Sequence, residues 1–153
     1  MEIGVSGWSI PLDKFVKGGL DKLELVARKT VIVVYKGVIM DTPVDEGRAR
    51  GGWMSSVGAP ASPMTASEGF EGEMTQTFDL DPSGRETVEE MKNMVTQDWK
   101  PLTGEKAIMA NNVPYINALN EGHSKQSPKH FVQLNVIRAG GIAQDAAAGG
   151  SGE

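Results

Sequence analysis

The sequence contains no cysteine, which excludes disulfide bonds, thiolate nucleophiles and zinc sites with sulfur ligands. A chain without disulfides fits a reducing compartment. The sequence also lacks a long apolar run, because the longest, TVIVVYKGVIM, is interrupted by Lys36 and is too short to span a bilayer. The first residues, MEIGVSGWSI, have no basic region followed by an apolar core, so no signal peptide is expected. We therefore expect a soluble protein.

Basic residues are not in excess. Lys and Arg number 15 against 20 Asp and Glu, which gives a formal net charge of −5. Proteins that wrap nucleic acid without sequence preference neutralise many phosphates with Lys and Arg, so this mode of binding is not expected. The charge is compatible with DNA passing nearby, because an acidic surface repels DNA and keeps it from adhering.

Signatures of catalytic sites are also missing. The sequence has no Walker pattern GxxxxGK[ST], no GxSxG elbow and no HExxH spacing. His123 and His130 are seven residues apart with Glu121 close by, but a loop with a proline separates the two rings. Glu89 and Glu90 are adjacent in a predicted helix and point in different directions. We therefore predict no catalytic residue, no metal ligand and no cofactor, and expect that the chain is not an enzyme.

The length and composition predict one domain. At 153 residues the chain can bury a substantial core. Hydrophobic residues make up 39% and charged residues 23%, and 19 glycines indicate many turns. Residues 1–11 are expected to form an arm or short strand that Pro11 ends, and residues 141–153 a flexible tail. Residues 12–140 remain as the single domain.

A long helix is predicted from Leu12 to Met40, with an interruption at Gly18-Gly19 as an open alternative. The β-branched run TVIVV favours a strand by propensity. Periodicity favours a helix, because Lys22, Lys29 and Lys36 recur every two turns. The opposite face carries apolar residues at helical spacing: Leu20, Leu23, Ala27, Val31, Val34 and Val38.

Three further apolar residues lie within or beside the charged stripe of this helix. Leu25, Ile32 and Ile39 are also seven apart. A helix that is apolar on several sides is covered on several sides. Either a loop or the C-terminal helix of the same chain covers them, or they form a contact between subunits. We favour the subunit contact.

The stretch DTPVDEGRARGGW follows this helix and is interpreted as a structural corner. Pro43 disfavours helical backbone before it and so closes the helix, and Gly47 suits a turn with positive φ. Arg48-Ala49-Arg50 then alternates charged and apolar residues, and GGWMSSVG is predicted to be a strand that carries Trp53. A phosphate-binding loop is excluded, since the order is helix then strand. Contact of the two arginines with DNA stays open, but pairing with acids at a turn or a subunit contact is favoured.

The remaining elements follow from periodicity and turn chemistry. Residues 58–69 are expected to form a loop, and FEGEMTQTFDL one or two strands with Phe70, Met74 and Phe78 inside. A helix is predicted behind a capping box from Ser83 to Glu86. The apolar stripe of this helix is expected to lie in the core, and Pro101 after it stops the helix. This stripe is formed by Val88, Met91, Val95 and Trp99.

The last third is expected to hold one strand and two helices. EKAIMANN is predicted to be a short strand after a turn at Thr103-Gly104. A short helix begins at Val113-Pro114, carries Tyr115, Ile116 and Leu119 on one side, and ends at Gly122. Pro128 is expected to open a last helix that continues through Phe131 to about Ile142.

A long helix followed by TPVDEGRARGGW, and much later by NNVPYINALNEGHSKQSPKHFV, resembles the tail-completion or head–tail joining proteins of long-tailed bacteriophages, the family of minor tail protein Z-like neck components. In that family a TPV-D-x-G-x-x-R turn precedes a Trp-ended strand, and a later tyrosine segment precedes a proline and the final helix. The resemblance covers residues 12–138. The spacing from Tyr115 to Glu121-Gly122 and the isoleucine after Tyr115 depart from the pattern. The matching positions are Thr42, Pro43, Val44, Asp45, Gly47, Arg48, Arg50, Trp53, Asn112, Tyr115, Leu119, Glu121, Gly122, Ser124 and Pro128.

The resemblance implies an α+β fold in which a small mixed or antiparallel sheet packs against the long N-terminal helix and two or three further helices. It implies a homo-oligomeric ring, expected to be a hexamer, at the head-proximal end of the tail. Such a ring completes the tail and joins it to the head-tail connector or stopper protein. It also contacts the tail tube or tail terminator protein, and DNA passes through its lumen without sequence-specific binding. The implied location is the virion, after assembly in the host cytoplasm, with no membrane partner.

Five residues are hypothesised to form the contact between subunits. Leu25, Ile32 and Ile39 would pack against the next subunit, and Arg48 and Arg50 would pair with acids across that contact. Two other functions stay open. One is a nucleic-acid-binding module, and the other is a small metal-dependent hydrolase that uses the two histidines and their glutamate neighbour.

Overall fold

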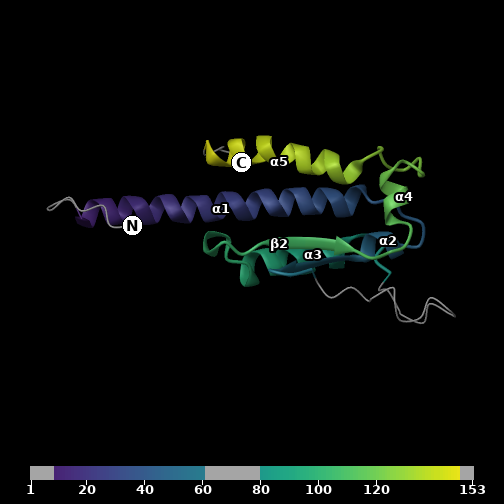
Figure 1. The fold of residues 1–153 in the computed structure, drawn as a ribbon, viewed down its shortest axis with the longest axis horizontal. Helices are drawn as coiled ribbons and strands as arrows, with labels where there is room; N and C mark the ends of the chain where they lie inside the picture. Colours follow the sequence, from purple (N-terminus) through teal and green to yellow (C-terminus); the bar gives the residue numbers. More distant parts are fainter. Residues whose placement is uncertain (1–8, 61–79, 149–153) are drawn as a thin grey trace.

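A computed structural model describes the backbone of residues 9–60 and 80–148 and the side chains of residues 17–60, 80–145 and 148. Within these residues the chain has an α+β fold of five α-helices and one two-stranded antiparallel sheet, which confirms the implied fold class. The long helix α1 (Ser9–Asp41) forms the middle layer in Figure 1. Helix α5 (Phe131–Ala147) lies along one side of it. The sheet and α3 (Arg85–Asn93) lie along the other side.

Helix α1 is continuous over 33 residues, about 50 Å, and is not interrupted at Gly18-Gly19. It begins at Ser9, so residues 9–11 are helical, and their assignment to an N-terminal arm is wrong. Pro11 lies in the first turn, where a helix needs no backbone N–H donor from it. Among the described residues, no helix has a stretch long and apolar enough to cross a membrane.

The sheet pairs β1 (Trp53–Val57) with β2 (Ala107–Asn111). Its register places Trp53 opposite Asn111 and Val57 opposite Ala107. Both strands were predicted. The strands expected around Phe70, Met74 and Phe78 lie outside the described residues.

The core forms around α1, which packs against α5 on one side and against α3 and the sheet on the other. The predicted stripe of the α3 segment is buried, as expected for a helix face directed inward. Helix α3 does not continue as an α-helix, because Met94–Asp98 form a wider π-helical turn, η1. The cluster of buried hydrophobic residues comprises Val38, Ile39, Trp53, Val88, Met91, Met94, Val95, Trp99 and Phe131.

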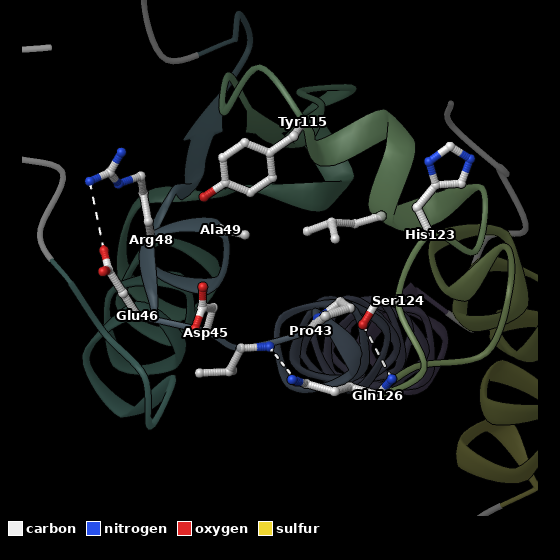
Figure 2. A pocket seen from close by; sticks show the side chains of 11 residues that line it. Pro43, Asp45, Glu46, Arg48, Ala49, Tyr115, His123, Ser124 and Gln126 are labelled. Atoms are coloured by element: carbon white, nitrogen blue, oxygen red, sulfur yellow. Dashed lines mark hydrogen bonds and ion pairs between the residues drawn. The ribbon is translucent and has the colours of Figure 1, made fainter. Parts of the chain in front are cut away.

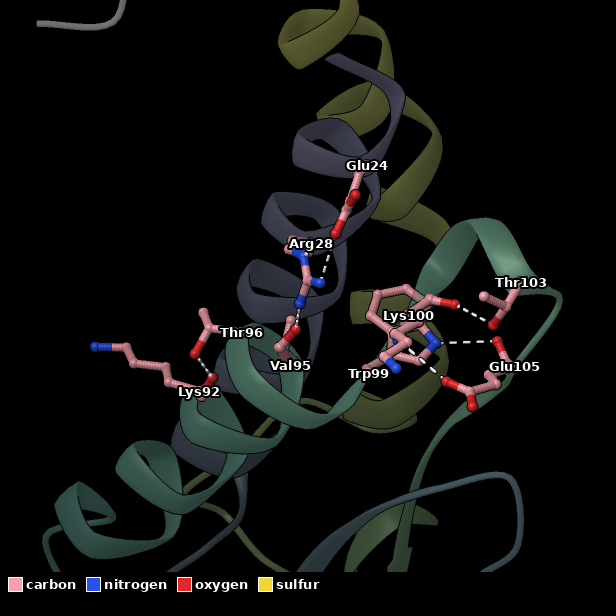
Figure 3. Close-up of polar contacts among 9 residues, drawn as sticks. All are labelled: Glu24, Arg28, Lys92, Val95, Thr96, Trp99, Lys100, Thr103 and Glu105. Atoms are coloured by element: carbon pink, nitrogen blue, oxygen red, sulfur yellow. Dashed lines mark hydrogen bonds and ion pairs between the residues drawn. The ribbon is translucent and has the colours of Figure 1, made fainter. Parts of the chain in front are cut away.

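Polar contacts join η1 to its neighbours (Figure 3). The guanidinium of Arg28 on α1 donates to the backbone oxygen of Val95 and also pairs with Glu24 at 2.6 Å. Beyond η1, the indole Nε1 of Trp99 donates to the backbone oxygen of Glu105 at 2.9 Å. That bond closes the turn that contains the 3₁₀ segment η2 (Pro101–Thr103) and leads into β2.

Helix α5 packs closely on α1 at one glycine. The side chain of Asn135 is buried and its Nδ2 donates to Asp41 Oδ2 and to the Phe131 oxygen, both at 2.8 Å. A Cβ atom at Gly37 would overlap the amide of Asn135. The helix runs to Ala147, so residues 141–147 are helical, and their assignment to the flexible tail is wrong.

Gly37→Ala should therefore lower the free energy of unfolding by about 1–3 kcal/mol, because Asn135 must move and lose its bonds. Urea denaturation followed by circular dichroism measures this. Gly19→Ala is the matched control, since a Cβ there meets no neighbour. The control should raise stability by about 0.5–1 kcal/mol. A Gly37→Ala chain as stable as the control would contradict close packing of the two helices.

Candidate functional site

The corner after α1 is held by the guanidinium of Arg50, on the short helix α2 (Arg48–Gly51). Its Nη2 donates to the backbone oxygens of Met40 at 2.8 Å and Thr42 at 3.0 Å. Its Nη1 donates to the oxygen of Pro82 at 2.8 Å. The last carbonyls of a helix have no partner within it, and a cation there is favourable. Arg50 therefore caps α1 and ties it to the segment that leads into α3.

A buried pair of side chains fixes the other side of the corner. The indole Nε1 of Trp53 donates to Thr42 Oγ1 at 2.8 Å, and that hydroxyl donates to the Val38 oxygen at 2.7 Å. Gly47 between them has a φ of 89°, and a Cβ there would overlap Pro82. The residue types of the motif are thus explained by close packing and hydrogen bonding within one chain.

Asp81 caps α3 in place of the predicted Ser83–Glu86 box, which is wrong. The helix begins after Gly84, and Asp81 Oδ2 accepts from the backbone N–H of Thr87 at 3.0 Å and from its hydroxyl at 2.9 Å. Ser83 donates to the other carboxylate oxygen at 2.8 Å. Burial alone would raise the pKa of Asp81, but these bonds outweigh it and hold the pKa below its ordinary value.

Asn120 organises the second motif segment, at the end of α4 (Ile116–Asn120). Its Oδ1 accepts from the N–H of Val132 at 3.0 Å, and its backbone oxygen accepts from the N–H of His130 at 2.6 Å. His130 has a φ of 60°, an uncommon conformation for a residue with a side chain. These two hydrogen bonds to Asn120 fix the start of α5 at Phe131. Pro128 lies in the loop before the helix and does not open it.

The two motif segments meet around one surface pocket of about 300 Å³ (Figure 2). The backbone N–H of Val44 donates to Gln126 Oε1 at 2.8 Å, which joins the corner to the loop after α4. Sequence reasoning missed Gln126, because nothing in the pattern links positions 82 residues apart. The lining residues are Pro43, Val44, Asp45, Glu46, Arg48, Ala49, Tyr115, Leu119, His123, Ser124 and Gln126.

The pocket lining combines apolar surface with charged side chains. The ring of Tyr115 faces across it toward Ala49 and Pro43 (Figure 2). Arg48 and Glu46 approach each other to 3.9 Å at its edge, and both side chains reach solvent. Such a hollow suits contact with an apolar side chain of another molecule, with charges at the margin.

The hypothesised interface residues on α1 separate into two groups. Ile39 has no exposed surface and lies in the core, so its assignment to a subunit contact is wrong. Ile32 packs partly buried against the same core, which favours cover within the chain. Leu25 is 53% exposed and remains available to another molecule. Seven-residue spacing keeps these three within about 40° of one another around the helix. Their different exposure therefore follows from their places along α1, because the core covers the helix at Ile32 and Ile39 but not at Leu25.

The hypothesised arginine pairs across subunits are replaced by bonds within the chain. Both terminal nitrogens of Arg50 are bonded to backbone oxygens of its own chain, which favours a structural role for Arg50 over pairing across subunits. Burial lowers the pKa of Arg50, and the charges of Asp81 and Asp41 oppose that effect. Arg48 approaches Glu46 of its own chain.

Glu121, His123 and His130 were the candidate metal ligands of the hydrolase alternative. Within residues 9–60 and 80–148 no group of three or more His, Asp or Glu side chains is placed to hold a metal ion. Comparisons of the chain with protein-family models, with curated proteins and with solved structures found no match.

Asp81→Asn should lower the free energy of unfolding at pH 7 by about 1–3 kcal/mol, because the helix loses a charged acceptor. A depressed folded pKa contributes stability above the unfolded value of about 3.9, and that contribution disappears as the pH falls from there through the folded pKa. The difference from the wild type should therefore shrink below about pH 4. Urea denaturation at several pH values measures it, with exposed Asp98→Asn as the control. An equal loss at pH 7 and pH 3 would refute the charged cap.

Arg50→Met should lower the free energy of unfolding by roughly 2 kcal/mol, since three carbonyl oxygens lose a charged donor. Arg48→Met is the matched control and should cost less than about 1 kcal/mol, as expected for an exposed ion pair. Both values come from urea denaturation of dilute protein. If Arg50→Met instead leaves unfolding unchanged and weakens self-association, Arg50 belongs to the subunit contact after all.

Proposed function

We propose that the chain is a structural protein of the bacteriophage neck. Copies of it form a ring at the head-proximal end of the tail, which completes the tail and joins it to the head connector while DNA passes through the lumen. In this proposal the function is carried by contacts between proteins and involves no reaction. The observation that carries it is the apolar surface that α1 leaves uncovered.

The inner stripe of α1 is covered at one end only. Val34 and Val38 are 7% and 2% exposed, whereas Leu20 and Leu23 on the same stripe are 45% and 58% exposed. The N-terminal part of the helix projects beyond α5 and beyond the sheet layer (Figure 1). A stripe that is buried over half its length and then continues without cover supports a contact with another molecule.

Helix α5 adds apolar surface on its outer side. Leu134, Val136 and Ile137 are exposed, and Ile137 is the most exposed of the large hydrophobic residues that the structure describes, at 75%. Single exposed apolar residues are ordinary on a folded protein. Three within four positions of α5 support a surface used in assembly.

The resemblance supplies the identity of that assembly. Its two motif segments cooperate in one structural unit, joined by Val44 and Gln126 and closed by Arg50 and Trp53. The residues that match the family pattern therefore hold one structural unit together. This supports a scaffold shared with the neck proteins. The net charge of −5 suits a lumen from which DNA must slide without adhering.

Electron microscopy of the purified chain should show rings with a central hole, and gold-labelled antibodies should mark the head-to-tail junction of the phage that encodes it. The double variant L20S/L23S should lose the rings while its free energy of unfolding stays within about 0.5 kcal/mol of the wild type, since both side chains are exposed. Assembly only after addition of tail tubes would also support the proposal. A monomer indifferent to tails and capsids would overturn it.

A further inference from the structure

Helix α1 presents a second uncovered surface, opposite its buried stripe. Six exposed residues spaced three or four positions apart follow one side of the helix. Three are lysines and three are apolar, and no acidic residue interrupts them. We call this surface the basic face, and it consists of Lys22, Leu25, Lys29, Val33, Lys36 and Met40.

The basic face combines apolar area with charge of one sign. Leu25, Val33 and Met40 are between 42% and 53% exposed. The ion pairs among the described residues join Arg28 to Glu24 and Arg48 to Glu46, so the three lysines take no part in them. A solvated face of a helix usually alternates charges of both signs. Interleaved lysines and large apolar side chains instead favour contact with an acidic surface.

An acidic surface of matching length lies on α3 and η1 of the same molecule. Glu86, Glu89, Glu90 and Asp98 are exposed there and outnumber the basic Arg85 and Lys92 of α3, while the buried residues of both elements are directed to the core. We call these four residues the acidic face. From the first to the last the acidic face spans a little under 20 Å, and the lysines of the basic face span about 20 Å. Exposed apolar residues flank the acidic face, namely Leu80 before α3 and Leu102 in η2.

We propose that the basic face of one copy binds the acidic face of α3 and η1 on the next copy. Two basic faces cannot pair with each other, because lysines would then oppose lysines. In the proposed ring this contact is head-to-tail, and a head-to-tail contact closes into a ring when its rotation permits. This inference rests on the proposed ring and names the two surfaces that build it. Apolar contact supplies most of the affinity, and the charges set register and direction.

Charge exchange between two variants tests the direction of the contact. The variant K22E/K29E/K36E should form no rings alone, and neither should E86K/E90K/D98K. In the first chain both faces are acidic, and in the second both are basic. An equimolar mixture should assemble again into even-numbered rings in which the two chains alternate. Mass photometry and electron microscopy measure ring content, with at least a tenfold loss for each variant and recovery in the mixture.

A control variant separates this contact from a general effect of charge. K106E/K125E/K129E changes the net charge of the chain by the same amount as the basic-face variant, at exposed positions outside both faces, and should keep its rings. If the wild type forms rings that resist both reversals, the ring stands and these two faces do not build it. If the wild type never assembles, the proposed function and this inference fall together. If the basic-face variant keeps its rings but loses retention on DNA, the face is a nucleic-acid surface and this inference is overturned.

Discussion

The guanidinium of Arg50 is the contact on which the arrangement of the layers depends. It binds the last carbonyl oxygens of α1 and the carbonyl oxygen of Pro82, so one side chain fixes both the end of the central helix and the approach to α3. An arginine suits this place because its donors lie in a fixed plane and it stays charged. Lysine would offer a single nitrogen to three acceptors. Trp53 and Thr42 complete the corner by packing and hydrogen bonding beside it.

Much of this fold follows from local pattern. Periodicity predicted α1 and the buried stripe of Val88 and Met91, and turn chemistry predicted the closure of α1 near Pro43 and the turn at Gly47. Such features depend on residues within one or two helical turns of each other. The periodicity of Val88, Met91, Val95 and Trp99 predicted an α-helix through η1 and gave no sign of the wider π-helical turn, in which the Val95 oxygen accepts from Arg28 on another element.

The errors at the site share a different cause. Ile39 is apolar in any arrangement, and its spacing cannot reveal whether its own chain or a neighbour covers it. Arg50 and Asp81 satisfy backbone groups that are brought near by tertiary structure, whereas sequence reasoning assigned Arg50 to a partner subunit and gave the cap to Ser83. Every residue has backbone N–H and C=O groups, so the residue types alone do not reveal which backbone group a side chain will bond. The pocket between the motif segments could not be predicted either, because a backbone N–H, that of Val44, bonds the distant Gln126.

Helix α1 divides its surface between folding and, in the proposed ring, contact with the next copy. The residues committed to folding are buried in a single copy, and those on the basic face are exposed. Changes at the basic face should therefore alter association without altering the fold. In an obligate oligomer, by contrast, folding and association cannot be separated. The proposed contact also has an electrostatic consequence for DNA. In the proposed ring, lysines paired with carboxylates of the next copy would form no basic band for phosphates to bind, so the acidic subunits would line a lumen that repels DNA.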